Sequence, residues 1–397
     1  MKFIRNILDK AKVPFEKGNK LEKYHHLFET VETLMFVPNE TTRLKGVQVR
    51  DAVDLKRFMM TVIIALVPAL LFGMYNVGYQ YYAAVGLEPT SSWDLWWVGI
   101  QRVIPIIIIT YLFGLFITEF AFSVIRKHPI NEGFLVSGIL IPMVMPPTIP
   151  LWQVAFASIF AVVMAKEAFG GTGMNVLNVA LVARAFLYFA YPSDISGDQV
   201  WVYLGDQMAV DGFSGATPLA LASSTLETGQ NVVQTFAAST NDFSFANLFY
   251  GFVPGAIGET SVLMILIGAA ILIFTGVGSW KVILSVFGGA YAMALLLSVV
   301  GANQYMLMPA HYHLVIGGLA FGAVFMATDP VTASQTETGK WIYGFLIGVL
   351  TIIIRVLNPA YPEGIMLAIL FMNVFAPLVD YYVVAANKKR RLKRATV

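Results

Sequence analysis

The polar stretch Asp211–Leu219 places a threonine hydroxyl directly after a run of small residues. It reads Asp-Gly-Phe-Ser-Gly-Ala-Thr-Pro-Leu. The Ser-Gly-Ala run offers small side chains and free backbone N–H groups, which let a phosphate approach closely. Thr217 suits the N-cap of a helix and Pro218 its first position, so a phosphate on that hydroxyl would lie at the positive end of the helix. A plain helix start without a ligand fits the same residues.

This nonapeptide resembles the site at which a flavin transferase esterifies the phosphate of FMN to a threonine hydroxyl. In families that carry S/T-G-A-T after an Asp-Gly pair, the threonine is the acceptor, which here is Thr217. The resemblance implies covalent FMN on this residue. The surrounding FMN loop would include Asp211, Ser214, Gly215 and Ala216.

The elements that must position this loop are those of a membrane protein. Of 397 residues, 57% are hydrophobic and only 13% are charged, and the mean hydropathy is +0.69, far from the composition of a soluble domain. A membrane span needs roughly 20 apolar residues. We therefore predict an all-α polytopic membrane protein with about ten transmembrane helices. They are expected at residues 58–78, 97–124, 134–146, 150–168, 174–191, 261–278, 281–300, 312–327, 341–357 and 364–385.

The distribution of basic residues predicts the orientation of these spans. Residues 1–57 hold 12 Lys and Arg residues, and six more lie within Lys388–Arg394. Residues 192–260, in contrast, hold seven carboxylates and no Lys or Arg. By the positive-inside rule, both termini are cytoplasmic and the loop with Thr217 is periplasmic. The basic tail would anchor on anionic membrane lipid.

The chain divides into two five-span units around that loop. We predict a cytoplasmic amphipathic arm at 1–57, five-span repeats at 58–191 and 261–386, the periplasmic loop at 192–260, and a basic cytoplasmic tail at 387–397. The repeats share a spacing, because 14 residues separate Trp152 from Lys166 and also Trp341 from Arg355. Repeats with an odd number of spans must be inverted across the membrane, as in many transporters. Prolines at 142, 146, 147 and 150 predict half-helices at the midplane.

Further motifs along nearly the whole chain are shared with one family. They are Asp54–Arg57, Arg126–His128, Asn131–Phe134, Pro146–Thr148, Lys166-Glu167, Phe169–Gly173, Met326–Pro330 and Asn358–Gly364. In these motifs the chain resembles the B-subunit family of the sodium-translocating NADH:quinone oxidoreductases. The resemblance implies a urea-channel-like fold, which agrees with the inverted repeats.

The same resemblance implies a six-subunit complex of the bacterial inner membrane. Its five other subunits would include one with a second covalent FMN, an NADH-oxidising subunit with FAD and an iron–sulfur centre, and further membrane subunits. A flavin transferase would mature the chain, and no nucleic acid partner is expected. The implied cofactors are covalent FMN and noncovalent riboflavin, with ubiquinone as the substrate and sodium as the transported ion. Electrons would pass from a partner flavin to FMN on Thr217, then inward to riboflavin and quinone.

Other functions compete with this one. The D-type membrane protein of the related Rnf complex shares the flavinylated loop, but it generally lacks a basic arm like residues 1–57. A urea-channel-like solute channel without a redox role would need no flavin, so an absorption spectrum distinguishes it. An NADH-binding enzyme in one chain is excluded, because no G-x-G-x-x-G follows a strand pattern. The chain has no cysteine, which excludes disulfides and iron–sulfur ligation by this subunit.

Asn175 and Asn178 are the candidate riboflavin ligands, together with Gly173 in the glycine turn before them. The two amides lie one turn apart at the expected start of span 5, so they would share a helix face. Such a pair could match the donor and acceptor edge of an isoalloxazine ring. The alternative is that both amides bond neighbouring backbone near the half-helices.

Ionisable residues within spans are functional candidates by default. For a sodium pathway we select Asp380 and Glu119, with Asp329 at a proline-broken helix end, because hard cations prefer oxygen ligands. Arg184 and Arg355 also qualify, with snorkelling or structural pairing as the alternative to a functional role. No other metal site is predicted.

The arm is the candidate quinone region. Its apolar residues, which include Tyr24, Phe28 and Val31, recur at helical spacing, typical of a helix on a membrane surface. Given the direction of electron flow that the family implies, the arm as far as Lys56 could shield quinone near the inner face. Packing of the same stripe against a partner subunit fits equally well.

Overall fold

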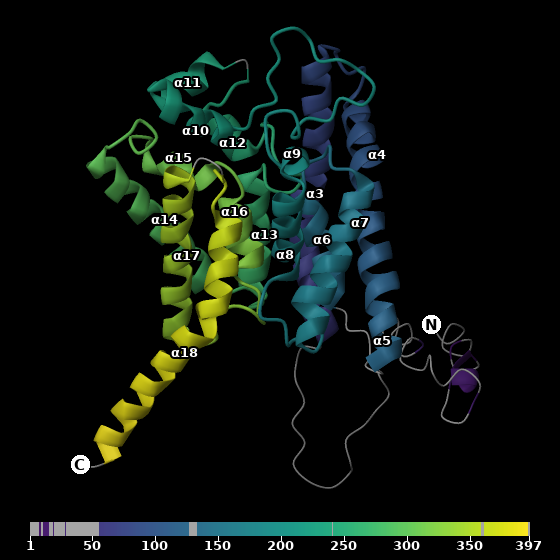
Figure 1. Cartoon of the computed structure of the whole chain (residues 1–397), viewed down its shortest axis with the longest axis vertical. Coiled ribbons are helices and arrows are strands. Elements are labelled where there is room, and N and C mark those ends of the chain that lie inside the picture. The colour runs from purple at the N-terminus through teal and green to yellow at the C-terminus, as the bar shows by residue number, and fades with distance from the viewer. Residues whose placement is uncertain are drawn as a thin grey trace.

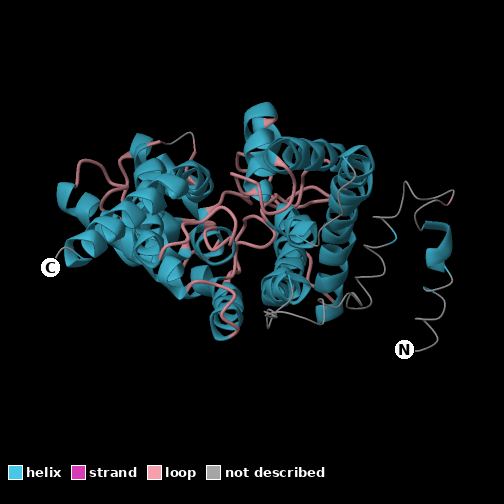
Figure 2. Ribbon diagram, turned by 90° about the horizontal axis from the view of Figure 1, so that it is seen from below, coloured by secondary structure: helices cyan, strands magenta, loops and turns pink. Residues whose placement is uncertain are grey.

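The computed structural model describes residues 55–126, 133–239, 241–358 and 361–395, together with residues 8, 11–15, 19 and 28. These residues form helices and loops without a strand (Figures 1 and 2), so the prediction of an all-α protein is confirmed. Among them, six helices are long and apolar enough to cross a membrane. They are Arg57–Val85, Ser92–Arg126, Leu151–Phe169, Trp280–Val300, Glu337–Leu357 and Ile365–Arg394. These helices support the prediction of a polytopic membrane protein.

The first group of helices ends before the polar loop. It contains α3 (Leu55–Val85), α4 (Ser92–Thr110), α5 (Phe120–Arg126), α6 (Gly133–Met143), α7 (Leu151–Ala161) and α8 (Val179–Ala190). Three helical segments that are not α-helical extend these helices. They are the π-helices η3 (Tyr111–Glu119) and η4 (Val162–Lys166) and the 3-10 helix η5 (Glu167–Phe169). Because η3 joins α4 to α5, these three pieces form one continuous span.

The second group follows the polar loop. It contains α13 (Val262–Phe274), α14 (Trp280–Val300), α15 (Ala310–Val315), α16 (Leu319–Phe321), the π-helix η6 (Gly322–Met326), α17 (Glu337–Leu357) and α18 (Ile365–Ala395). Residues 312–327 were expected to form one span. They fold as separate pieces instead, because Ile316 is extended and Gly317 adopts a φ of +66°.

Three more of the ten expected spans are short helices. α6, α8 and α13 have 11, 12 and 13 residues. At about 1.5 Å per residue they reach about 16–20 Å, less than the roughly 30 Å hydrocarbon core of a bilayer. The α6 helix ends just after Pro142, and Pro146 and Pro147 follow in the turn. Short helices joined by proline turns leave polar backbone groups that side chains must satisfy.

Glycines allow the long helices to pack backbone to backbone in both groups. A Cβ on Gly99 of α4 would stand 1.8 Å from the Met74 carbonyl oxygen of α3. A Cβ on Gly289 of α14 would stand 2.2 Å from the Phe345 carbonyl oxygen of α17. Close approach at small residues is the usual way in which membrane helices associate. Figure 1 shows α3 and α4 on one side of the molecule and α14, α17 and α18 on the other.

The polar segment between the two groups folds into four short helices. They are α9 (Pro192–Ile195), α10 (Pro218–Thr228), α11 (Val232–Ala238) and α12 (Phe245–Tyr250). The last three gather at the upper end of Figure 1, opposite the C-terminal end of α18. The acidic loop and the basic tail therefore lie at opposite ends of the helices.

Little of the N-terminal arm is described. The short 3-10 helix η1 (Val13–Phe15) contacts Phe28, whose ring stacks on that of Phe15 with centroids 5.0 Å apart. Tyr24 and Val31 lie outside the described residues, as does the side chain of Lys56. The proposed quinone region therefore stays a prediction.

Candidate functional site

Thr217 caps α10, as its sequence predicts. Its backbone is extended (φ −78°, ψ 158°), its hydroxyl accepts a hydrogen bond from the Ala220 amide at 3.2 Å, and Pro218 follows at the first helical position. The residue is half-buried, so its hydroxyl can be reached from outside the fold. The N-terminal N–H groups of α10 favour an anion at this point.

The residues before Thr217 are held against another part of the polar segment. A Cβ on Gly215 would stand 2.5 Å from the Asp198 carbonyl oxygen, so glycine permits this close approach. The Asn241 amide donates to the Ser214 carbonyl at 3.0 Å. In the FMN loop, Asp211 and Ser214 are exposed, Gly215 is half-buried and Ala216 is buried. The loop is therefore anchored while the threonine stays accessible.

A pocket of about 100 Å³, which we call the Thr217 pocket, opens beside the threonine. Its lining includes Trp201, Leu219 and Leu248 on apolar surfaces and Glu259 and Glu363 as carboxylates. Thr260 also lines it, and the Thr260 hydroxyl is buried without a hydrogen-bond partner in the described part of the chain. The pocket thus combines an apolar wall with polar groups that have capacity to bond a ligand.

The carboxylates of this pocket meet Arg184 of α8. One guanidinium nitrogen, Nη1, donates to the Val144 carbonyl and to Glu259 Oε1, the latter at 3.1 Å. The other nitrogen, Nη2, donates to Glu363 Oε2. The three side chains are only 4%, 5% and 14% exposed. Structural pairing of Arg184, one of the two expectations, is confirmed.

Sequence reasoning missed Glu259 and Glu363 as parts of a site. Each stands just before an apolar helix, Glu259 before α13 and Glu363 before α18. A carboxylate at such a position is costly to bury unless it is paired. That signal was available, but the partner, Arg184, lies far away in sequence.

Arg355 of α17 is fully buried and bonds backbone rather than carboxylates. It donates to the carbonyls of His313 at 2.8 Å and Ile316 at 3.2 Å. It also reaches the Glu363 carbonyl at 3.4 Å. Arg355 thereby satisfies the carbonyls freed where α15 ends, which agrees with the expected structural role.

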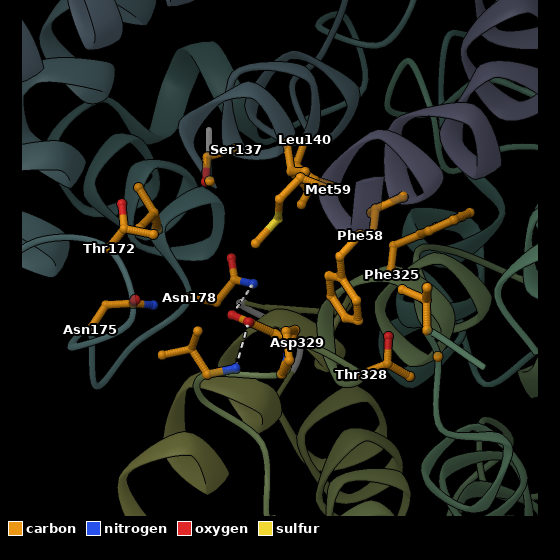
Figure 3. Close-up of a pocket in the computed structure, with 18 of the residues that line it drawn as sticks. Phe58, Met59, Ser137, Leu140, Thr172, Asn175, Asn178, Phe325, Thr328 and Asp329 are labelled. Carbon is orange, nitrogen blue, oxygen red and sulfur yellow. Dashed lines mark hydrogen bonds between the residues drawn. The ribbon is translucent and has the colours of Figure 1, made fainter. Parts of the chain in front are cut away.

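A second pocket, which we call the Asn178 pocket, has a volume of about 90 Å³. Figure 3 shows Asn178 and Asp329 pointing toward each other at its centre, with Phe58 and Met59 of α3 on another side. Asn175 and Thr172 also line it. The pocket is therefore built from residues of both helix groups.

The two asparagines do not share a helix face, and that prediction was wrong. The helix α8 begins only at Val179, so Asn178 is its N-cap and Asn175 lies in the preceding turn. Asn178 Oδ1 accepts from the Ala180 and Leu181 amides at 3.0 and 3.2 Å. The Asn175 amide donates to the Leu177 carbonyl at 3.2 Å. Both residues nevertheless line one pocket, whereas Gly173, with a φ of +88°, is exposed in the turn outside its lining.

Asp329 is held where the helices of the second group are broken. Its carboxylate accepts from the Val331 amide at 3.0 Å and the Thr332 hydroxyl at 3.0 Å. It also accepts from Asn178 Nδ2 at 3.4 Å, a long contact that Figure 3 draws as a dashed line. This contact ties the start of α8 to the second group of helices.

Glu119 and Lys166 form a buried ion pair at the ends of two π-helical segments, η3 and η4. The Lys166 side chain also lines the Asn178 pocket. Segments of π-helix frequently mark functional sites, and nothing in the sequence pattern distinguished them from ordinary helix.

Asp380 of α18 lies apart from both pockets. Its oxygens accept from the hydroxyls of Ser334 and Thr336 at 2.6 Å each and from the backbone amides of Gln335 and Thr336 at 2.7 and 3.0 Å. It therefore fixes the turn that starts α17. The described residues contain no cluster of three or more acidic, histidine or cysteine side chains suited to a metal, so Asp380, Glu119 and Asp329 do not form one site.

Comparison with known proteins identifies the family. The NQR2, RnfD, RnfE family matches residues 44–389 of this chain. The B subunit of the Na(+)-translocating NADH-quinone reductase of Chromohalobacter salexigens is 48% identical over 98% of this chain and 96% of its own length. Proteins of the same name from Klebsiella pneumoniae and Ectopseudomonas mendocina are 47% and 46% identical, over 98% of this chain and 99% of theirs. The resemblance found in the sequence motifs is thus confirmed, and the chain belongs to the NQR2, RnfD, RnfE family.

Proposed function

We propose that this chain is a membrane subunit of a sodium-pumping NADH:ubiquinone oxidoreductase, the activity for which its relatives are named. In that complex it would relay electrons from a partner flavin to ubiquinone, coupled to sodium export. The observation that carries the proposal is Thr217, an accessible hydroxyl at a helix N-terminus beside a pocket. Covalent FMN on Thr217 and riboflavin in the Asn178 pocket would supply the electron transfer.

The Thr217 site suits a phosphate ester. The first turn of α10 would present its N–H groups to the phosphate, and Trp201, Leu219 and Leu248 offer apolar contact to a ring. The pocket, at about 100 Å³, is smaller than the roughly 300 Å³ or more of most small-molecule sites. Part of the flavin would therefore extend beyond the pocket, where a partner subunit could contact it.

The Asn178 pocket suits a noncovalent flavin. Asn175 and Asn178 supply amides and Thr172 a hydroxyl, while Phe58 and Phe325 supply rings. The 3.4 Å contact between Asn178 Nδ2 and Asp329 is weak, so Nδ2 could exchange it for a ligand while Oδ1 keeps its cap bonds. Phe58 also directly follows the arm, which would bring a quinone held by residues 24–56 close to this pocket.

The proposal also covers the sodium route and the topology. Glu119 and Asp329 supply oxygens on or near the Asn178 pocket, and Asp380 supplies them elsewhere. We further propose that the short helices complete ten spans arranged as two inverted, urea-channel-like repeats in the bacterial inner membrane. The acidic loop with Thr217 would then be periplasmic and both termini cytoplasmic, because loop and tail lie at opposite ends of the helices (Figure 1). Five partner subunits would complete the complex.

The D-type protein of the Rnf complex is the second candidate, because the matched family includes it. The three relatives described for the family cover 98% of this chain, including most of the basic arm, and all carry the name of the quinone reductase. We therefore place the Rnf function second. A solute channel without flavin is the third.

A substitution at residue 217 tests the proposal. Thr217→Ala and Thr217→Val both remove the hydroxyl, so each should abolish covalent FMN on this subunit. Thr228→Ala is the matched control, because Thr228 is an exposed threonine at the other end of α10. In-gel fluorescence and the intact mass of the denatured subunit, made together with its flavin transferase, report the attachment. An FMN mass that survives in Thr217→Ala, or its absence from the wild type, contradicts the assignment; a mere helix cap would cost about 1 kcal/mol and leave flavin content unchanged.

A further inference from the structure

Two carboxylates line the wall of the Thr217 pocket, and the proposed attachment of flavin to Thr217 does not use them. Glu259 lies in the loop before α13 and Glu363 in the loop before α18. Both line the pocket that Thr217 also lines. Both contact the same guanidinium, that of Arg184. They therefore form a compact charged group within reach of whatever occupies the pocket.

The two carboxylates share one positive charge. Both contact the guanidinium of Arg184, which can offset only one of two negative charges. Burial first, and then repulsion from Glu363, raise the pKa of the Glu259 carboxyl, while Arg184 lowers it in part. In general, the ionisation of one buried carboxylate makes the ionisation of a close neighbour more costly.

The other charged and titratable groups around the pair do not neutralise it directly. Tyr188 of α8 faces Glu363, and the buried Tyr361 hydroxyl has no hydrogen-bond partner among the described residues. Arg355 of α17 donates to the backbone carbonyl of Glu363 rather than to its carboxylate. Among the described side chains, Arg184 is thus the cation in direct contact with both carboxylates.

Two glycines, Gly317 and Gly318, leave space for the side chains beside the carboxylate pair. A Cβ on Gly318 would stand 2.8 Å from Glu259 Oε2. Its neighbour Gly317 adopts a φ of +66°, and a Cβ there would stand 2.4 Å from Leu219 Cδ1. Glycine at both positions therefore lets the broken helix pass between the Glu259 carboxylate and the first turn of α10.

We infer that Glu259 and Glu363 hold one proton between them and bind it more tightly when negative charge enters the Thr217 pocket. That charge would come from electrons added to a flavin on Thr217, so this part of the inference rests on the proposed function. In general, a unit charge about 8 Å from a carboxyl group, at an effective dielectric constant of about 20, changes the proton affinity of that group by roughly 30-fold. The coupling is reciprocal, so the proton also favours arrival of the electron. The pair takes its proton from water, and only the carboxyl O–H bond forms or breaks.

Infrared spectroscopy of the intact complex tests the shared proton. The wild type should show a protonated-carboxyl band that shifts in D₂O. The band should persist in Thr217→Ala, which lacks the flavin anchor, and disappear in both Glu259→Gln and Glu363→Gln, because a single carboxylate beside Arg184 ionises. Glu227→Gln, at an exposed carboxylate of α10, should leave the band unchanged. A wild type without the band, or a band that survives in either pocket variant, overturns the shared proton.

Redox titration tests the coupling. The midpoint potential of the flavin on Thr217 should depend more steeply on pH in the wild type and in Glu227→Gln than in Glu259→Gln or Glu363→Gln. Equal pH dependence in all four proteins overturns the coupling. A wild type that carries no flavin on Thr217 contradicts the proposed function and the coupling with it. The shared proton is then still decided by the infrared result, which needs no flavin.

Discussion

The Thr217 and Asn178 pockets are alike in size but differ in how each could keep a ligand. Their volumes are about 100 and 90 Å³. The Thr217 pocket is lined by a threonine and by two carboxylates, both of which contact Arg184. The Asn178 pocket has amides, hydroxyls, the Asp329 carboxylate and Lys166, which pairs with Glu119.

The two pockets would therefore retain a ligand in different ways, the first by a covalent bond and the second by noncovalent affinity. A ligand esterified to Thr217 cannot dissociate, so the surrounding pocket is free to carry groups that respond to charge. A ligand in the Asn178 pocket would be retained only by noncovalent contacts, each worth about 1 kcal/mol for a neutral hydrogen bond. We therefore expect substitutions in the first pocket to affect stability and electrostatics, and those in the second to affect occupancy.

The largest effect is expected at Arg184. Arg184→Ala leaves Glu259 and Glu363 buried without their common cation, which should cost about 3–5 kcal/mol of stability. A lower thermal unfolding midpoint of the purified complex would report it. Lys281→Ala is the control, because Lys281 pairs with the exposed Glu337 and such pairs contribute about 0–1 kcal/mol. Equal midpoints for the two variants would show that the buried group does not hold the fold together.

A smaller and more selective effect is expected at Asn178. Asn178→Ala removes one amide contact worth about 1 kcal/mol, so riboflavin should bind roughly fivefold more weakly while covalent FMN is unchanged. Denaturation releases riboflavin and leaves covalent FMN on the subunit, so the fluorescence of each fraction measures the two flavins separately. Asn231→Ala is matched to it, because Asn231 caps α11 in the same way but lies outside this pocket. Equal loss of riboflavin from both variants would assign the effect to capping alone.

The smallest effect is expected outside both pockets, at Asp380. Asp380→Ala removes a charged oxygen donor, so the sodium concentration for half-maximal quinone reduction should rise, by about fivefold or less for roughly 1 kcal/mol. Both flavins should remain. Asp380→Asn keeps the shape and removes the charge, so a sodium role predicts the same shift in both variants. If Asp380→Asn has normal sodium dependence and only the alanine variant is impaired, the residue serves the turn before α17 instead.

Local patterns predicted the first pocket better than the second. The Thr-Pro pair signals a helix start by itself, and Thr217 does cap α10. The Asn175 and Asn178 pair looked like one helix face, but the helix begins only after the second of them. Helical spacing tells which residues face together only once the start of the helix is known.

The sequence by itself determined the membrane class, the family, the all-α fold and the threonine that caps α10, because apolar length, shared motifs and capping chemistry are local. Tertiary structure alone decided which buried charges meet: Arg184 with Glu259 and Glu363, and Glu119 with Lys166. It also decided that residues 310–326 break into short pieces. The physical reason is that a charge or a freed carbonyl in an apolar interior must find its partner wherever the chain brings one, and that partner lies 47 to 179 residues away in these pairs.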